Sequence, residues 1–209
     1  MPIFRKDGRN ILFVHVPKTG GSTIEKVFRE SGYQTLYLDG KVGPASVNHV
    51  RRCTPQHMHA DMLEMNFRLG NFDEIFMMVR DPLSRFKSEY IWRNRKDLKV
   101  VDAESVNSWG AKVFKQYARD NFVFDNHLRR QVEFHLPNSS VYRFEDGMRG
   151  VVDDLNARLD LGLNPDIPKL KDGKQQTGFS SSDVIVSPDM EAKVKEIYGE
   201  DYTSFGYPL

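Results

Sequence analysis

The residues best suited to chemistry lie in a glycine-containing segment near the N-terminus, which reads His15-Val16-Pro17-Lys18-Thr19-Gly20-Gly21-Ser22-Thr23. Glycine lets main-chain N–H groups approach an anion, and a helix N-terminus adds unpaired donors and partial positive charge. Lys18 adds a mobile cation, and Thr19, Ser22 and Thr23 add hydroxyl donors. The segment predicts a cradle for a phosphate-type anion; a plain strand–helix turn without a ligand is the alternative.

The order of residues in this segment differs from that of the Walker loop. The pattern G-x-x-x-x-G-K-S/T places its lysine after the glycines, whereas Lys18 precedes Gly20 and Gly21. An arginine, Arg80, follows the apolar run Ile75–Val79, where a kinase of the P-loop type would place a magnesium-binding aspartate. Such a small-molecule kinase stays as one alternative function, and a catalytically silent nucleotide-binding module stays as another.

A second segment with anion-binding residue types runs from Arg80 to Tyr90 and reads RDPLSRFKSEY. Arginine matches phosphate oxygens bidentately, and Ser88 lies two turns into the helix expected to begin at Pro82. Arg80, Arg85 and Ser88 therefore predict a second anion site. Surface ion pairs of Arg80 with Asp81, or of Arg85 with Glu89, are the alternative, and such pairs contribute little stability.

Together, the two segments resemble the nucleotide motifs of sulfotransferases that use 3′-phosphoadenosine 5′-phosphosulfate (PAPS). HVPKTGGST resembles their 5′-phosphosulfate loop, and RDPLSRFKSEY resembles their 3′-phosphate motif, R-D-P-x-x-R-x-x-S-x-Y. The similarity is closest to the carbohydrate sulfotransferases of the heparan sulfate and dermatan/chondroitin 2-O type and to their bacterial relatives. The C-terminal DYTSFGY also resembles the family ending D-Y/F-x-x-F/L-G-Y.

The resemblance implies a PAPS-dependent transfer of the sulfuryl group to a hydroxyl by in-line displacement. It implies that Lys18 contacts the phosphosulfate bridge and stabilises charge on the leaving phosphate, while Arg80 and Ser88 hold the 3′-phosphate. The 5′-phosphate would be held by Thr19, Gly20, Gly21, Ser22 and Thr23. No metal is expected, because a sulfuryl group carries less charge than a phosphoryl group, so that lysine, N–H groups and helix dipoles replace Mg²⁺.

A candidate base lies in the sequence His57-Met58-His59. Attack by a sugar hydroxyl needs a base that accepts a proton near neutral pH, and histidine has an unperturbed pKa of about 6.5. Residues i and i+2 share a face only if the segment is extended. The 2-O-sulfating relatives carry an H-x-H pair between the two loops, so the resemblance implies His59 as base and His57 as a substrate-orienting or supporting group.

Two other interpretations of this segment stay open. Cys53, His57, His59 and Asp61 offer metal-ligating atoms, although their spacing is tighter than in usual structural zinc sites. Alternatively, the two histidines are ordinary loop residues. His15, which leaves a buried strand, is interpreted as a core histidine whose polar atoms are satisfied.

An alternation of strands and helices must position these residues. Apolar, β-branched runs predict buried strands at 11–16, 33–38, 74–79 and 140–144. Ser22 or Thr23 is expected to cap the first helix, and Pro82 suits the first turn of a later one. The expected helices cover about 22–30, 60–69, 82–95, 104–119, 125–135, 147–159 and 187–198, with loops at 40–56 and 164–187.

This order predicts an α/β fold: one domain over residues 1–209, with a mostly parallel central sheet flanked by helices and a P-loop-like strand–loop–helix. In such sheets, ligands bind beyond the carboxyl ends of the strands. Both candidate segments follow strands at that end.

Composition excludes several classes of protein. The chain of 209 residues is 39% hydrophobic and 28% charged, as is typical of a globular protein. A formal net charge of +1 argues against nucleic-acid binding, and a single cysteine excludes an intrachain disulfide. The apolar run Ile11–Val16 is too short for a secretory signal or a membrane helix. We expect a cytoplasmic, bacterial-type protein that binds neither membranes nor nucleic acid.

The acceptor is less well defined, and the resemblance favours a carbohydrate hydroxyl. One interpretation of a set of cations is a cleft for an anionic glycan, and the other is a solvated surface of mixed charge. These cations are Arg51, Arg52, Arg93, Arg95, Lys96 and Lys99. A polar loop over 171–177, with Lys171, Lys174, Gln175, Gln176 and Thr177, is a candidate for closing over PAPS or the acceptor.

Overall fold

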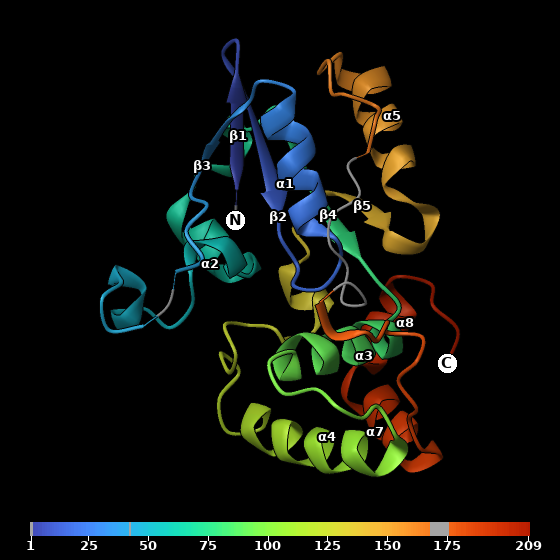
Figure 1. Cartoon of the computed structure of the whole chain (residues 1–209). Coiled ribbons are helices and arrows are strands. Elements are labelled where there is room, and N and C mark those ends of the chain that lie inside the picture. Colours follow the sequence, from blue (N-terminus) through green and yellow to red (C-terminus); the bar gives the residue numbers. More distant parts are fainter. Residues whose placement is uncertain (1, 42, 168–175) are drawn as a thin grey trace. The chain divides into compact units, whose positions relative to one another are not determined.

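The computed structural model describes residues 2–41, 43–167 and 176–209 (Figure 1). The chain forms two compact units, one of Met1–Val79 with Glu133–Leu170 and one of Arg80–Val132 with Lys171–Leu209. The single domain expected over 1–209 stays a prediction. Lys171, Lys174 and Gln175 of the expected closing loop lie outside the described residues.

The first unit is built on a five-stranded sheet of order β3-β1-β2-β4-β5. Its strands are β1 (Ile3–Lys6), β2 (Arg9–Val14), β3 (Gln34–Leu36), β4 (Glu74–Val79) and β5 (Ser140–Arg143). Strands β2, β4 and β5 are parallel neighbours, whereas β1 runs antiparallel to both β2 and β3. The four strands expected from sequence are confirmed, and β1 is an addition. The expectation of a mostly parallel sheet is wrong, because β1 makes two of the four strand pairs antiparallel.

Strand β1 belongs to a tight hairpin with β2. Asp7 and Gly8 connect the two strands with positive φ angles of 49° and 81°. An Asp-Gly pair favours this type of turn, because both central residues must adopt left-handed backbones.

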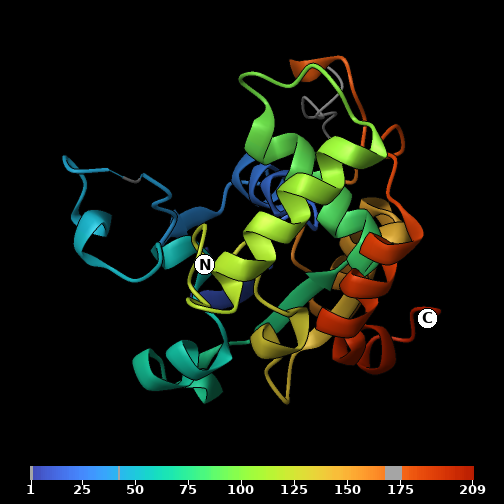
Figure 2. The same cartoon turned by 90° about the horizontal axis from the view of Figure 1, so that it is seen from below.

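The described part of the first unit also contains the α-helices α1 (Gly21–Glu30), α2 (Ala60–Asn66) and α5 (Met148–Leu159). The apolar faces of α1 and α5 join the sheet in one core, in which Phe28 stacks on Phe4 with ring centroids 3.9 Å apart. Fully burying side chains of this size stabilises the fold by about 1.5–3 kcal/mol each. Figure 2 views α1 close to its axis. This packing fixes the start of α1 relative to the end of β2.

The described part of the second unit includes helices α3 (Pro82–Asn94), α4 (Ala103–Tyr117), α7 (Pro188–Ile197) and α8 (Gly199–Ser204). Aromatic contacts hold it together, among them Phe86 with Phe114 at 5.4 Å and Tyr90 with Trp109 at 5.3 Å. The side chain of Asp81 caps α3 by accepting from the main-chain N–H of Ser84 at 2.8 Å. The predicted start at Pro82 is confirmed.

The helix predicted over 125–135 is wrong. This region forms turns followed by a short 3-10 helix, Gln131–Phe134. Phe124, Asp125 and Asn126 have positive φ angles of 55°, 61° and 64°, which no right-handed helix allows. The three residues with positive φ prevent a helix from beginning at residue 125.

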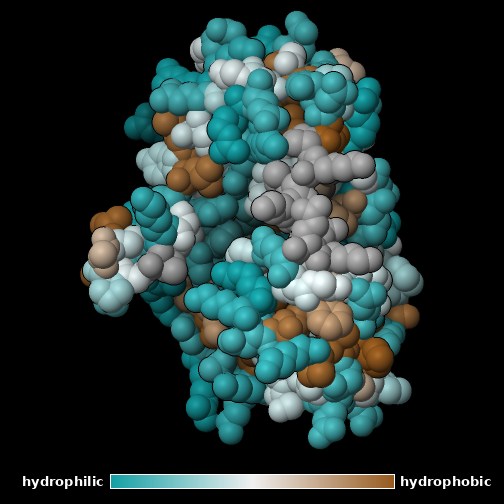
Figure 3. All heavy atoms as spheres, in the orientation of Figure 1, coloured by the Kyte–Doolittle hydropathy of each residue, from teal (hydrophilic) through white to brown (hydrophobic). Residues whose placement is uncertain are grey.

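The face of the molecule seen in Figure 3 carries mostly hydrophilic side chains, with some apolar ones among them. Within the described parts of the chain, no helix is long and apolar enough to cross a membrane. The expected cytoplasmic location stays a prediction.

Candidate active site

The loop between β2 and α1 has an unusual backbone. Lys18 has a φ of 70°, a left-handed conformation that costs a non-glycine residue about 1–3 kcal/mol and is concentrated at functional sites. Gly20 also has a left-handed backbone, with φ 90°, and is the N-cap of α1. The prediction of Ser22 or Thr23 as the cap is therefore wrong: both lie inside the first helical turn.

The two glycines are favoured for different reasons: Gly20 by its left-handed backbone and Gly21 by the imidazole of His15. A Cβ atom on Gly20 would lie 2.0 Å from Cε of Met148, and one on Gly21 would lie 2.1 Å from Nε2 of His15. The imidazole of His15 thus occupies the space that a side chain at position 21 would need. Main chain, and no side chain, therefore faces the loop at both positions.

The hydroxyl donors of this loop differ in their surroundings. The Thr19 side chain is fully buried, and its hydroxyl donates to the main-chain oxygen of Val16 at 2.8 Å, so it holds the loop. Ser22 is exposed and Thr23 is half-buried. Among the described residues, no side chain caps the N-terminus of α1. First-turn N–H groups, the partial positive charge of a helix N-terminus and a lysine such as Lys18 are groups that bind anions in proteins, so this loop is the candidate anion site of the first unit.

The histidine pair lies in the same unit. His57 ends a short 3-10 helix, Pro55–His57, while Met58 and His59 have extended backbones and His59 is the N-cap of α2. Both imidazoles are buried, with 8% of His57 and 7% of His59 exposed. The ring of His57 meets the ring of His15 edge to face, with centroids 5.1 Å apart. This contact connects the histidine pair with the loop after β2.

The alternative of a metal site finds no support in this segment. In the described ranges, no three His, Cys, Asp or Glu side chains converge in a way that could hold a metal ion. Asp61 is exposed, and the buried thiol of Cys53 lies 3.6 Å from Sδ of Met62.

In the second unit, the main chain of Arg80 is held by Gln131, which sequence reasoning missed. The main-chain N–H of Arg80 donates to Oε1 of Gln131 at 2.9 Å, and Nε2 of Gln131 donates to the Arg80 carbonyl at 2.8 Å. The guanidinium of Arg80 donates to Oγ of Ser181 at 3.1 Å. Ser88 lies half-buried on α3.

Arg85, the third residue of the predicted second anion site, has a structural role. Its side chain is only 3% exposed, and its guanidinium donates to the carbonyl of His127 at 2.8 Å and lies over the Tyr198 ring. His127 in turn contacts the buried Glu89 at 2.7 Å. Arg80 and Ser88 remain as the candidates for anion binding in this segment.

Gln131 is itself held by Asp201 of the C-terminal DYTSFGY sequence. The fully buried carboxylate accepts from the main-chain N–H groups of Gln131 and Val132, both at 2.9 Å. Burial raises the pKa of Asp201, and the nearby Arg85 and these N–H groups offset part of that rise. A buried carboxylate therefore fixes the residue that holds Arg80.

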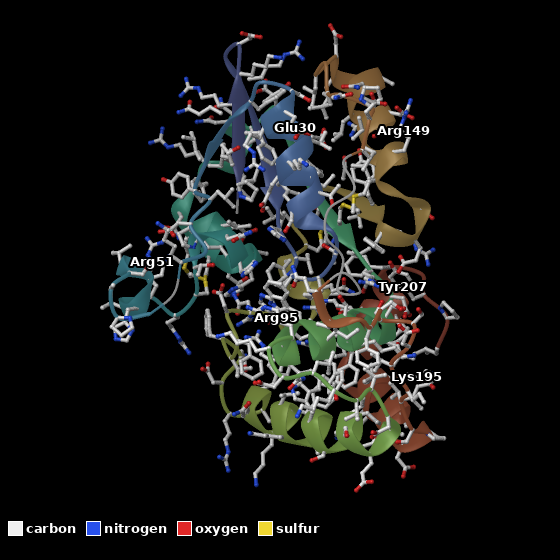
Figure 4. The ribbon with its side chains drawn as sticks, viewed as in Figure 1. Glu30, Arg51, Arg95, Arg149, Lys195 and Tyr207 are labelled. Carbon is white, nitrogen blue, oxygen red and sulfur yellow. The ribbon has the colours of Figure 1, made fainter. Side chains whose placement is uncertain are left out.

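The cations considered for glycan binding have varied surroundings. Arg93 forms an ion pair with Glu89 at 2.6 Å, and the guanidinium of Arg95 lies 3.9 Å from the centroid of the Trp92 ring. Figure 4 shows Arg95 at the end of α3 and Arg51 on the segment between β3 and α2. Trp109 packs against Phe86 at 5.3 Å.

A cavity of about 380 Å³ lies near the amino end of strand β4, whereas the loop after β2 follows the carboxyl end of its strand. Its lining includes Glu64, Asp73 and Glu74. Acidic walls repel an anionic nucleotide. The loop after β2 is the better candidate.

Two comparisons with known proteins give matches, and a third gives none. A family model described as "Sulfotransferase family" matches residues 1–208. A sulfotransferase from Alicyclobacillus acidocaldarius is similar in structure, with 14% sequence identity, 96% of this chain and 97% of that chain covered, and a TM-score of 0.48. None of the curated proteins compared with the chain matches it.

Proposed function

The chain belongs to the sulfotransferase family, and from this premise we propose that it transfers the sulfuryl group of PAPS to a hydroxyl of a carbohydrate. The observation that carries the proposal is the backbone of the segment after β2, in which Lys18 and Gly20 have left-handed conformations directly before the N-terminus of α1. We interpret this segment as a P-loop-like cradle for the phosphosulfate group, because N–H groups at a helix N-terminus bind such anions. The family match runs through both units, which supports one sulfotransferase domain.

The reaction is an in-line displacement at sulfur. The acceptor oxygen forms a bond to sulfur while the bond between sulfur and the bridging oxygen breaks, and adenosine 3′,5′-bisphosphate leaves. Lys18 and the first-turn N–H groups of α1 stabilise the charge that develops on the leaving phosphate. His59 accepts the proton of the acceptor hydroxyl, and His57 orients the acceptor or supports His59.

The 5′-phosphate is held by the main chain at Thr19, Gly20 and Gly21 and by the hydroxyls of Ser22 and Thr23. The hydroxyl of Thr19 is committed to Val16. In the second unit, Arg80 and Ser88 hold the 3′-phosphate. Since these groups are all donors or cations, the donor nucleotide needs no metal ion.

Nucleotide binding tests this proposal directly. By calorimetry in EDTA, adenosine 3′,5′-bisphosphate should bind about 10- to 150-fold more tightly than AMP, the effect of one charge-assisted phosphate contact. Tighter binding of ATP with Mg²⁺ would instead favour a kinase.

A screen with radiolabelled PAPS tests the acceptor class. Desulfated heparin, desulfated dermatan and neutral polysaccharides serve as carbohydrate acceptors, and simple phenols and alcohols as controls. Labelled polysaccharide is the expected product. Labelling of the phenols alone would contradict a carbohydrate acceptor.

A further inference from the structure

A buried polar cluster in the first unit joins three segments that are distant in sequence. His15 follows β2, Glu25 lies on α1, and Gln56 and His57 precede α2. Nδ1 of His15 lies 2.8 Å from Oε1 of Glu25, and Nε2 of Gln56 donates to the same oxygen at 3.0 Å. His15 and Glu25 are 5% and 7% exposed.

Stability alone gives no reason for this cluster. Removing a carboxylate and an imidazole from water costs several kcal/mol, and apolar side chains of similar volume are often as stable or more stable in such places. The cluster also lies on the face of α1 that otherwise buries Ile24, Val27 and Phe28. A polar group on this face needs another explanation.

The hydrogen bonds fix the orientation of the His15 ring. Nδ1 of His15 lies 2.8 Å from Oε1 of Glu25 and 3.2 Å from Nε2 of Gln56, so two side chains hold this edge of the ring. The opposite edge of the ring, with Nε2, then faces Gly21 at the start of α1, where a Cβ atom would lie 2.1 Å away. The ring is thus held between Glu25 and the anion-binding loop.

The same cluster reaches the histidine pair. Gln56 donates a hydrogen bond to Glu25. The next residue, His57, packs edge to face on His15, with ring centroids 5.1 Å apart and an interplanar angle of 81°. His59 follows two residues later. The place of the His57–His59 segment therefore depends on Glu25 and His15.

We propose that Glu25, His15 and Gln56 are positioning residues that hold the His57–His59 segment against the phosphosulfate-binding loop. They contact neither donor nor acceptor. This proposal rests on the proposed function, in which His59 of this segment is the general base. Replacing groups that orient metal ligands typically lowers metal affinity or activity about 10- to 100-fold, and we expect an effect of similar size here.

The test compares Glu25→Leu, which removes the acceptor, with Glu25→Gln, which keeps an acceptor oxygen for Nδ1 of His15. With PAPS and desulfated heparin, Glu25→Leu should lower kcat about 10- to 100-fold, with the affinity for adenosine 3′,5′-bisphosphate within about twofold of wild type. Glu25→Gln should retain most of kcat. Glu30→Leu, on the exposed side of the same helix (Figure 4), is the control and should behave as wild type. Unchanged kcat in Glu25→Leu would overturn the proposal.

Histidine side-chain NMR gives a readout that needs no turnover. In Glu25→Leu, the ring resonances of both His15 and His57 should shift from their wild-type positions. Gln56→Leu carries the same test if Glu25→Leu does not fold. Unmoved His57 resonances would refute the positioning role even if no acceptor were sulfated. Absence of sulfation by wild-type protein, with the expected NMR shifts, would instead count against the proposed function alone.

Discussion

Gln131 pairs with both main-chain polar atoms of Arg80, accepting from its N–H at 2.9 Å and donating to its carbonyl at 2.8 Å. This side chain extends the hydrogen bonding of the chain one residue beyond β4, which ends at Val79. These two hydrogen bonds fix the main chain of Arg80. The fixed main chain limits the positions that the guanidinium of this residue can reach.

We expect Arg80→Ala to lose most of the preference for adenosine 3′,5′-bisphosphate over AMP. A charge-assisted contact to the 3′-phosphate is worth about 1.5–3 kcal/mol, so the ratio of the two affinities should fall about 10- to 150-fold. Calorimetry with both nucleotides measures the ratio. Arg149→Ala removes an exposed arginine of α5 that pairs with Asp153, and should leave the ratio unchanged. An unaltered ratio in Arg80→Ala would place the 3′-phosphate elsewhere.

Asp201→Asn should destabilise the protein. The two carboxylate oxygens of Asp201 each accept from one main-chain N–H, whereas an amide has one accepting oxygen and an NH₂ group that can only donate. Leaving one buried N–H unsatisfied costs about 1–3 kcal/mol. Urea unfolding of both proteins measures this loss. Asp189→Asn, on the exposed part of the first turn of α7, is the matched control and should cost little.

The difference in unfolding free energy between wild type and Asp201→Asn should also depend on pH. Burial raises the pKa of Asp201 above its ordinary 3.8, so the folded state holds the proton more tightly than the unfolded state. This contribution to stability is complete below about pH 4 and is lost as the pH rises through the folded-state pKa. The wild-type advantage over Asp201→Asn should therefore shrink between acid and neutral pH. An advantage that grows with pH would mean that the pKa is lowered instead.

Much of the fold could be predicted because it depends on local patterns. The apolar run EIFMMV is strand β4 from its first residue to its last, and the Asp-Pro pair at 81–82 starts α3. Gln131 and Asp201 could not be found in this way, because they act on main-chain groups 51 and 70 residues away. One feature of the sequence could have identified Glu25 as a buried polar residue: it lies between apolar positions on the buried face of an amphipathic helix.

Gly21→Ala should destabilise the protein through His15. The new methyl group would lie 2.1 Å from Nε2 of an imidazole held by Glu25, and overpacking of this kind costs about 1–3 kcal/mol. In a double-mutant cycle followed by urea unfolding, His15→Ala should relieve part of this cost. Gly150→Ala, inside α5 with open space around its Cβ position, should instead be neutral or stabilising by up to about 1 kcal/mol. Additive effects of Gly21→Ala and His15→Ala would mean that the two residues do not conflict.

Lys18→Ala should lower kcat far more than it lowers nucleotide affinity. The proposed contact strengthens only as charge develops on the leaving phosphate, so it belongs to the transition state. Steady-state kinetics with PAPS, together with calorimetry of adenosine 3′,5′-bisphosphate, separates the two effects. Lys26→Ala removes a surface cation that pairs with Glu30 on α1 and should change neither quantity. A raised KM for PAPS with normal kcat would make Lys18 a binding cation only.

His59→Ala should lower the rate about 10²- to 10⁴-fold, the range for loss of a general base, with the affinity for adenosine 3′,5′-bisphosphate unchanged. His57→Ala should cost less, or act on the KM of the acceptor, because only one of two buried rings on this segment can accept the hydroxyl proton. In wild type, the rate should fall at acid pH as a base with an ordinary histidine pKa of about 6.5 becomes protonated, and this acid limb should vanish in His59→Ala. His49→Ala, an exposed histidine of the same unit, is the control. If His57→Ala were the more damaging change and removed the acid limb, the base would be His57, with His59 in the supporting place.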